Sequence, residues 1–381
     1  MRVCPVCTSR KSHNMYEVNF VLPDEFPLNT VQIIKVCDDC GMVFSDSGNN
    51  QTDFDNYYSR SSKYTSIAVL TTFDQQRFKE TFNSLKDFMS LDSAICDLGC
   101  GGGGLLSHLH SCGYKNLTGI DGGELIQEKF NFIRSDLFSF SDNLNESFDL
   151  VICTGVIEHV YEIDRVLRSI HVSLKDNGFV YIEVPDASRY FNFVTSPFQD
   201  FNIEHINHFS ERTLINLLQR SLFEIVQAVS ILQQESEVHK MPVIRIMARK
   251  SDRAVVIQKD NSLRDNIYRY IELSENMMLS FEAFLSEKLE NQTEVYIWGV
   301  GQLTLKLLGL KLFTRIRIAG LVDRNPIFSK VQGISVEKPT EPLNPEIPII
   351  IGSTINAAVI KSDIETLGLN NLIIELEISS S

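Results

Sequence analysis

Two histidines, a glutamate and two asparagines stand within ten residues of the sequence, "FNIEHINHFS", from Phe201 to Ser210. The stretch follows a strand-like run, "GFVYIEVPD", and precedes a helix-like run, "ERTLINLLQR". Histidine titrates near neutral pH and can act as a general base, and an adjacent carboxylate can orient a substrate or raise the basicity of the histidine. We therefore interpret Glu204 and His205 as a candidate acid–base pair; the alternative for His205 is a hydrogen-bonded structural histidine.

Four cysteines near the N-terminus form two CxxC pairs, Cys4 with Cys7 and Cys37 with Cys40. A two-residue spacer lets both thiolates of a pair reach one tetrahedral ion, and two pairs close a four-cysteine site. Since cysteine fills all four positions, none is left for a catalytic water, and we predict a structural zinc. The other four cysteines are scattered through strand-like and helix-like stretches and do not indicate a disulfide framework.

A glycine loop, "ICDLGCGGGG", places Asp97, Gly99 and Gly101 at a strand-to-helix turn. Glycine permits a tight turn and the close approach of a ligand to the backbone. The GxGxxG spacing also fits a dinucleotide. Asp97, directly before the loop, suits the cationic amino acid end of S-adenosylmethionine and would repel a pyrophosphate. Asp121, at the end of "GID", can accept from the ribose hydroxyls of either cofactor.

Asp136, in "SDLFSF", stands beside apolar residues where an adenine amino group could bond, which also favours S-adenosylmethionine. Glu158 and His159 lie in "GVIEHV", and we interpret both as part of the wall of the cofactor pocket, with a catalytic role as the alternative. The predicted cofactor-binding residues are Asp97, Gly99, Cys100, Gly101, Asp121, Asp136, Leu137, Thr154 and Glu158.

The elements that must position these groups alternate between helical and strand patterns from about residue 76 to 250, which is typical of a parallel sheet with covering helices. Two strand-like runs at its end, "FEIVQAVSIL" and "VIRIMARK", are close enough to pair as a hairpin. A connector, "SDRAVVIQKDNS", and a long helical pattern lead into a second α/β unit.

Composition and charge exclude some classes of partner. The formal net charge is −14 and no basic run is dense, so a nucleic acid polymer is a poor candidate. No apolar run approaches the roughly 20 residues that span a bilayer. The N-terminal stretch has no apolar core of a signal peptide. We therefore predict a cytoplasmic protein that does not bind membranes.

The middle of the chain resembles class I S-adenosylmethionine-dependent methyltransferases. "DLGCGGG", "GID", "SDLFSF", "FDLVICTGVIEHV" and "LKDNGFVYIEVPD" match the loops of that family in order. The resemblance implies an α/β fold with a seven-stranded Rossmann-like sheet and a reversed last strand, which the hairpin would supply.

Nearly the whole chain resembles the three-domain sugar C-methyltransferases that make branched deoxysugars. The resemblance rests on the four cysteines, "NYYSRSSKY", "IEHINHFS", "IWGVGQLTLKLL" and "LVDRNPIFSKVQGISV". It implies a zinc-binding domain and substrate lid over residues 1–75, a methyltransferase core over 76–250 and a C-terminal Rossmann-like α/β domain over 251–381. The C-terminal domain would help to hold the nucleotide of a nucleotide-sugar substrate.

The same resemblance implies roles for the residues of the site. His205 would take the proton from a carbon next to a keto group, Glu204 would contact the sugar, and Tyr57 or Tyr58 would close the site. The implied substrate-binding residues are Ser61, Ser62, Asn202 and His208. Packing near Phe209 is the alternative for His208.

Asn202 stands where the family usually has a tyrosine, and three readings stay open because of it. They are methyl transfer to carbon, methyl transfer to oxygen or nitrogen of a small-molecule precursor, and cofactor binding without activity. A nicotinamide oxidoreductase is disfavoured by Asp97 and the Asp136 segment. The sugar, its nucleotide, the carbon attacked and the oligomeric state stay open.

Overall fold

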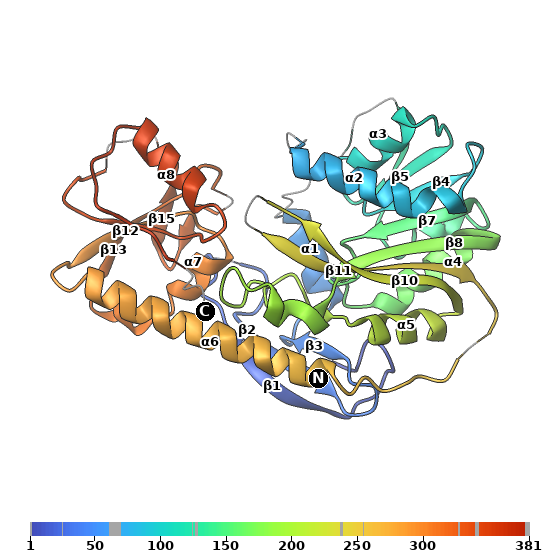
Figure 1. Ribbon diagram of the computed structural model, residues 1–381, viewed down its shortest axis with the longest axis horizontal. Coiled ribbons are helices and arrows are strands. Elements are labelled where there is room, and N and C mark those ends of the chain that lie inside the picture. Colours follow the sequence, from blue (N-terminus) through green and yellow to red (C-terminus); the bar gives the residue numbers. More distant parts are fainter. Residues whose placement is uncertain are drawn as a thin grey trace. The chain divides into compact units, whose positions relative to one another are not determined.

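In the computed structural model of the chain (Figure 1), the structure describes residues 2–24, 26–60, 70–123, 125, 129–236, 239–253, 255–326, 328–339 and 343–377, without the side chains of residues 59, 60 and 143. Ser61 and Ser62, predicted to bind substrate, lie outside the described residues. The chain forms two compact units. Unit 1 comprises Met1–Met15, Ile34–Tyr190 and Glu204–Asn266, and unit 2 comprises Tyr16–Ile33, Phe191–Ile203 and Ile267–Ser381.

A seven-stranded sheet forms the centre of unit 1. Its strands in spatial order are β10 (Phe223–Gln234), β11 (Lys240–Lys250), β8 (Leu174–Pro185), β7 (Phe148–Thr154), β4 (Ile95–Leu98), β5 (Leu117–Asp121) and β6 (Asn131–Arg134). The strands from β8 to β6 pair in parallel, and β11 is antiparallel to both of its neighbours. This order confirms the predicted class I sheet, with the hairpin of β10 and β11 supplying the reversed strand.

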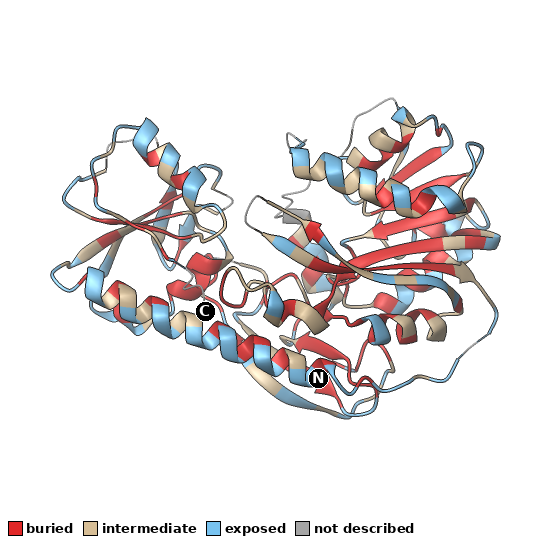
Figure 2. Cartoon of the chain, viewed as in Figure 1, coloured by how far each residue is buried: buried red, intermediate tan, exposed pale blue. Residues whose placement is uncertain are grey.

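Alternation along the strands sends apolar side chains to both faces of the sheet, because successive residues of a strand point in opposite directions. On one face Ile95 and Ile152 pack with Leu85 of α2 (Thr72–Leu85) and with α3 (Gly104–Ser111). On the other face Cys96 and Val151 pack with α4 (Ile163–Ser173) and α5 (Glu211–Arg220). Figure 2 shows the buried residues concentrated in the strands between these helices. The carboxyl ends of β4, β5 and β7 therefore meet at one edge, where open α/β sheets bind ligands.

A second, smaller sheet has the order β1 (Ser12–Asn19), β2 (Val31–Cys37), β3 (Val43–Asp46) and β9 (Asn207–His208). Its last strand comes from the loop that follows β8, far along the chain from the other three. In unit 1, β3 and β9 pair antiparallel, with Val43 opposite His208 and Phe44 opposite Asn207. The loop that carries Glu204 and His205, residues 204–208, is called the acid–base loop below. It is thus hydrogen-bonded to the segment that carries the cysteines.

Unit 2 contains a six-stranded sheet in the order β14 (Lys330–Val331), β15 (Ile334–Glu337), β13 (Arg317–Val322), β12 (Glu294–Trp298), β16 (Ile349–Ile351) and β17 (Ile373–Ile374). All pairs are parallel except β14 with β15. Counting only the parallel strands along the chain, their order is 3-2-1-4-5, which is a Rossmann-like arrangement. The C-terminal Rossmann-like unit is therefore confirmed.

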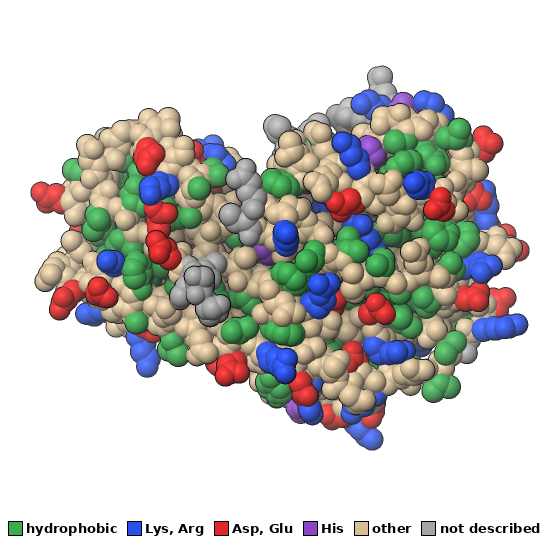
Figure 3. Space-filling view, viewed as in Figure 1, with side chains coloured by type: hydrophobic (Ala, Val, Ile, Leu, Met, Phe, Trp, Pro, Cys, Tyr) green, Lys and Arg blue, Asp and Glu red, His purple; other side chains and the backbone are tan. Residues whose placement is uncertain are grey.

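The remaining helices are α1 (Gln51–Arg60), α6 (Leu263–Lys288), α7 (Gln302–Leu307), α8 (Ala357–Thr366) and the 3-10 segments η1 (Lys86–Phe88), η2 (Phe140–Asn143), η3 (Ala187–Asn192) and η4 (Lys311–Thr314). Within the described ranges, no helix combines the length and the apolar composition that crossing a membrane requires. On the face drawn in Figure 3, basic and acidic side chains are interspersed.

Candidate active site

The glycine loop connects β4 to α3 at the carboxyl edge of the large sheet. Gly99 and Gly101 have φ angles of 77° and 48°, in the left-handed region that favours glycine. A Cβ on Gly99 would lie 2.6 Å from Cγ2 of Val156, whereas a Cβ on Gly101 or Gly102 would meet nothing within 4 Å. The loop is therefore packed against the turn after β7 on one side and has an open backbone on the other. That open side is where a ligand can approach the main chain.

Asp97 is the buried acid before this loop, with 4% of its surface exposed. Burial raises its pKa to about 7, and the nearby Asp121 carboxylate adds to the rise. Such a carboxyl gains from a cationic partner, because a positive charge would favour its ionised form. These observations fit the amino acid end of S-adenosylmethionine, which carries the positive charges of that cofactor.

Asp121 holds the glycine loop as well as facing it. Its Oδ2 accepts from the amide of Gly101 at 2.9 Å and its Oδ1 accepts from the amide of Gly123 at 2.9 Å. An ionised carboxylate has about four acceptor positions, so two remain for ribose hydroxyls. Asp121, the predicted ribose acceptor, thus also holds the glycine loop in place, a role that its position in the sequence did not indicate.

Asp136 caps the turn that follows β6. Its Oδ1 accepts from the amides of Phe138 at 2.8 Å and Ser139 at 2.7 Å. Burial would raise the pKa of Asp136, but these hydrogen bonds outweigh it and lower the pKa. One carboxylate oxygen is therefore engaged in holding its own turn. The other predicted cofactor residues, Cys100, Leu137 and Thr154, are half-buried at the same edge of the sheet.

Beside the cofactor edge, a turn, a loop and helix α1 bring together five side chains with acid–base chemistry. The turn, residues 155–161, follows β7, and the loop, residues 204–208, follows β8. The five residues are Tyr57, Glu158, His159, Glu204 and His205. The imidazole rings of His159 and His205 are 4.7 Å apart between centroids, with an interplanar angle of 72°. The ligand atoms of Glu158, His159 and His205 all lie within 4.8 Å of one another.

His159 has a defined tautomer. Its Nδ1 lies 3.1 Å from the backbone carbonyl oxygen of Glu204. A carbonyl can only accept, so Nδ1 carries the proton and, in the neutral ring, Nε2 has the lone pair. Nε2 lies 3.9 Å from Oε1 of Glu158. From "GVIEHV" we predicted only a place in the wall of the cofactor pocket for His159, whereas the structure puts its ring against that of His205.

Glu158 is 3% exposed, and burial raises its pKa. Its Oε2 has no hydrogen-bond partner among the described residues. A buried carboxyl whose pKa is raised, next to two imidazoles, can exchange a proton with them.

Two tyrosines of α1 reach this cluster. The hydroxyl of Tyr57 donates to Oε1 of Glu204 at 2.5 Å, which is the length of a charge-assisted hydrogen bond. The ring of Tyr58 meets the ring of His159 edge to face, at 6.4 Å between centroids. Of the two tyrosines predicted to close the site, Tyr57 is therefore bonded to the acid and Tyr58 packs on a histidine.

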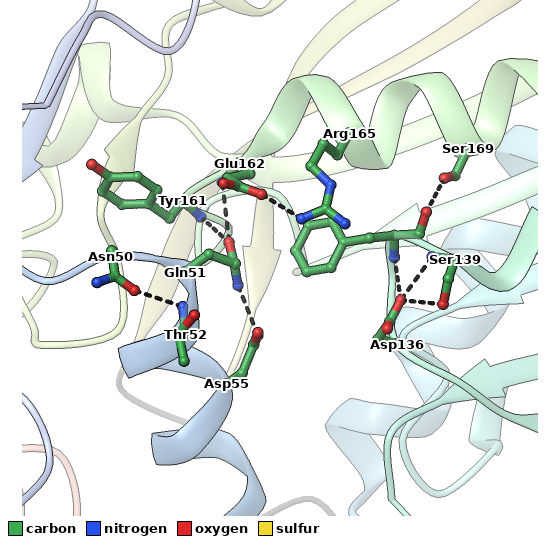
Figure 4. Close-up of polar contacts among 11 residues, drawn as sticks. Asn50, Gln51, Thr52, Asp55, Asp136, Ser139, Tyr161, Glu162, Arg165 and Ser169 are labelled. Carbon is green, nitrogen blue, oxygen red and sulfur yellow. Dashed lines mark hydrogen bonds and ion pairs between the residues drawn. The ribbon is translucent and has the colours of Figure 1, made fainter.

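The start of α1 is anchored on the turn after β7, as Figure 4 shows. Oε1 of Gln51 accepts from the amides of Tyr161 at 3.2 Å and Glu162 at 3.1 Å. The Nε2 of Gln51 donates to Asp55 one turn further along the helix, at 2.9 Å. This anchor sets the position of α1 and hence of its tyrosines; nothing in the pattern of the sequence indicated it.

The two other predicted substrate-binding residues lie in different surroundings. His208 is fully buried in β9, where its Nε2 lies 3.3 Å from the hydroxyl of Ser45 and burial lowers its pKa to about 3. This environment favours the alternative of a packing role for His208. Asn202 is half-buried and belongs to the segment of unit 2 that ends at Ile203, directly before Glu204.

The four N-terminal cysteines are brought together as the spacing predicted. Their sulfur atoms all lie within 4.8 Å of one another, with 3.5 Å between Cys4 and Cys40 and 3.4 Å between Cys7 and Cys37. Four thiolates around zinc at bond lengths near 2.3 Å would be about 3.8 Å apart, so the donor set and its size fit a tetrahedral ion. Three of the cysteines belong to the same apolar core as α5.

Residues 73–228 match a protein family described as "Methyltransferase domain". The matched residues include β4 to β8 of the large sheet, whose strand order is that of the class I fold.

Among curated proteins, the chain is similar to a tRNA U34 carboxymethyltransferase of Campylobacter fetus, with 30% identity over 43% of this chain and 62% of that protein. It is also similar to a ubiquinone biosynthesis O-methyltransferase of Rickettsia canadensis, with 31% identity over 23% of this chain and 41% of that protein. The chain thus spans less than two thirds of the length of these relatives. A Burkholderia thailandensis 1,6-didemethyltoxoflavin-N1-methyltransferase structure aligns with 58% of this chain and 96% of its own, at 16% identity and a TM-score of 0.41.

Proposed function

We propose that this chain is an S-adenosylmethionine-dependent methyltransferase that methylates a carbon next to the keto group of a nucleotide-linked deoxysugar. The observation that carries the proposal is the meeting of His159, His205 and Glu204 at the turn after β7, which packs against the glycine loop through Val156. Methylation of a hydroxyl needs little beyond proximity and one base. Two facing imidazoles with two carboxyl groups are better suited to removing a proton from carbon.

In this mechanism the cofactor supplies an electrophilic methyl group, and the residues of the chain prepare the acceptor. His205 takes the proton from the carbon next to the ketone. The electron pair of the broken carbon–hydrogen bond forms an enolate, whose carbon would take the methyl group as the methyl–sulfur bond of the cofactor breaks and leaves its electron pair on sulfur. Glu204, held by Tyr57, orients the sugar hydroxyls. His159, with its Nε2 lone pair beside Glu158, can relay the proton away from His205.

The substrate class is supported by the order of segments along the whole chain, from the cysteine cluster to the second Rossmann-like unit. Zinc at the cysteines would be structural, because four cysteine ligands leave no open coordination position. We also expect a cytoplasmic enzyme that does not bind a nucleic acid polymer, in keeping with the net charge of −14.

Methyl transfer to oxygen is the second candidate, favoured by the similarity to proteins named as O-methyltransferases. The residues of the site would serve this reaction too, since His205 could deprotonate a hydroxyl. The two candidates differ in the atom that receives the methyl group, and that atom can be observed directly.

The test uses cofactor with a carbon-13-labelled methyl group and a panel of nucleotide-linked 4-keto and 3-keto deoxysugars. Carbon-13 NMR of the product distinguishes a methyl group on carbon from one on oxygen. The matched control is the same sugar with its ketone reduced to a hydroxyl, which lacks an acidic carbon–hydrogen bond. We expect a C-methyl product from a keto sugar and no C-methyl product from the reduced sugar. An O-methyl product from both sugars would overturn carbon methylation.

Cofactor binding is expected to depend on pH through Asp97. Its pKa of about 7 in the free protein should fall when the cationic cofactor binds, so affinity should rise from about pH 5 to about pH 7 and then level off. Since the native carboxyl holds its proton more tightly than an unfolded one, the free protein should also lose stability as the pH rises from about 4 to about 7.

Calorimetry in two buffers with different ionisation heats measures both the affinity and the proton released on binding. Asp97→Asn should bind the cofactor weakly and without this pH dependence. Affinity that stays constant over this range in the unchanged protein would contradict the assignment of Asp97.

A further inference from the structure

Arg2 is a buried cation that joins three segments of unit 1. Only 4% of its surface is exposed. One guanidinium nitrogen, Nη1, donates to the carbonyl of Ser45 in β3 at 3.0 Å and to the carbonyl of Ile206 in the acid–base loop at 2.8 Å. The other, Nη2, donates to Oδ1 of Asn207 at 2.7 Å and lies 3.4 Å from the carbonyl of Tyr161 in the turn after β7. One side chain thus ties the turn, the loop and the cysteine-bearing segment together.

The charge of Arg2 has no carboxylate side chain within ion-pair distance in the described part of the chain. Its guanidinium is surrounded by carbonyl oxygens, and it lies over the ring of Tyr161 at 4.8 Å. Asp46 is near enough to act on this charge, but its Oδ2 accepts from the backbone amide of Arg2, at 3.1 Å. Burying a cation without a directly paired carboxylate is costly, and apolar residues of similar volume often stabilise a core better. The contacts therefore favour a role in geometry over a role in stability.

Asn207 extends the same network across the site. Its Nδ2 donates to the carbonyls of Ile157 at 2.9 Å and Val160 at 2.8 Å, on either side of Glu158 and His159. The amides of Ile206 and Asn207 both donate to the carbonyl of Glu158, at 2.9 and 3.1 Å. The turn that carries Glu158 and His159 is therefore fastened to the residues that directly follow Glu204 and His205.

We propose that Arg2 is a positioning residue for methyl transfer, which holds the loop of Glu204 and His205 in register with the turn of Glu158 and His159. This inference rests on the proposed function, because the placement of His205 affects the rate only if His205 is the base. Arg2 contacts neither the glycine loop nor Asp97 in the network described above. Its loss should therefore slow the reaction and leave the affinity for the cofactor unchanged.

The variants are Arg2→Met, which removes the guanidinium, and Arg2→Lys, which keeps the positive charge. A lysine ammonium cannot donate to all the carbonyls that the planar guanidinium reaches. The matched control is Arg212→Met, since Arg212 is an exposed arginine of α5 that donates to Gln258. Three measurements are made on each full-length variant: kcat, the dissociation constant of the cofactor, and the NMR titration of the His205 ring proton.

We expect Arg2→Met to lower kcat by roughly 100-fold, the loss that a displacement of about 1 Å at a catalytic group can cause. Arg2→Lys should lie between this variant and the unchanged protein. The cofactor dissociation constant should stay within a factor of about two. The titration midpoint of His205 should shift, and added guanidinium ion should restore part of the activity of Arg2→Met.

Unchanged kcat and an unchanged His205 titration in Arg2→Met would overturn the proposal, and so would a loss of cofactor affinity in proportion to kcat. If Arg2→Met does not fold, Asn207→Ser removes an acceptor of the same guanidinium and is judged by the same readouts. Failure of the proposed function looks different. In that case a His205→Asn variant keeps its turnover, while the Arg2 variants still shift the His205 titration.

Discussion

Replacing His205 with asparagine is expected to lower kcat by roughly 10²- to 10⁴-fold, the usual contribution of a general base. Asparagine keeps much of the ring's polar shape near His159 but cannot take a proton at neutral pH. The glycine loop and Asp97 are untouched, so the cofactor should bind as it does to the unchanged protein. Turnover is measured on the keto sugar that the labelling experiment identifies, and cofactor binding is measured by calorimetry.

His110→Asn is the matched control, because His110 lies in α3 and its Nε2 faces Lys115, at 3.4 Å from that ammonium nitrogen. It should retain full activity. Near-normal turnover in His205→Asn would remove the base assignment. His159 would then be the next candidate, because its Nε2 lone pair faces the same cluster.

Replacing Cys37 with serine is expected to have the second large effect, a loss of both the metal and turnover. Cys37 is 1% exposed and shares a core with α5. Apparent free energies of zinc binding to structural sites are about 10–16 kcal/mol and count toward folding. The variant should therefore contain little zinc after purification without chelators, and it should unfold at a lower temperature.

The effect should reach the site through contacts of the turn that carries the second cysteine pair. The carbonyl of Cys40 accepts from the amide of Asp260 at 3.0 Å, and a Cβ on Gly41 would lie 2.1 Å from the carbonyl oxygen of Asp260. The Asp260 carboxylate in turn accepts from the hydroxyl of Ser210 at 2.6 Å, and Ser210 caps α5 two residues after the acid–base loop. Displacement of the cysteine turn would therefore displace the end of the loop.

Cys112→Ser is the control for thiol loss. Cys112 is half-buried just after α3, outside the cysteine cluster. It should keep one zinc ion per chain and full turnover. Metal analysis and the thermal unfolding curve are recorded on the same samples. A Cys37→Ser protein with normal zinc content or normal turnover would contradict the structural role of the cluster.

The sequence predicted those features that leave a local pattern. The alternating elements indicated a parallel sheet with covering helices, and the resemblance to class I methyltransferases implied its seven strands and its reversed strand, which the adjacency of β10 and β11 could supply. Fixed spacing brought the four cysteines together. Sequence spacing could also have identified Tyr57 as the tyrosine that enters the site, because Phe54 and Tyr57 lie three residues apart on the buried face of α1.

Features that depend on long-range pairing could not be predicted. A two-residue strand such as β9 has no periodicity, so its pairing with β3 left no signal. The role of Arg2 left no signal in the sequence either, because most of its acceptors are backbone carbonyls, which any sequence supplies. The division into residues 1–75, 76–250 and 251–381 stays a prediction.

The pairing of β3 with β9 has a consequence for how the protein is made. Ser45 and His208, which meet in this pair, are 163 residues apart. At about 5–20 residues per second, a ribosome delivers β9 roughly 8 to 30 seconds after β3. The cysteine segment can take up its metal during that interval, but β3 must wait with one edge uncovered. Newly made chains should therefore be open to wrong strand pairing until the acid–base loop emerges, and release of a truncated chain before that point would leave the edge exposed.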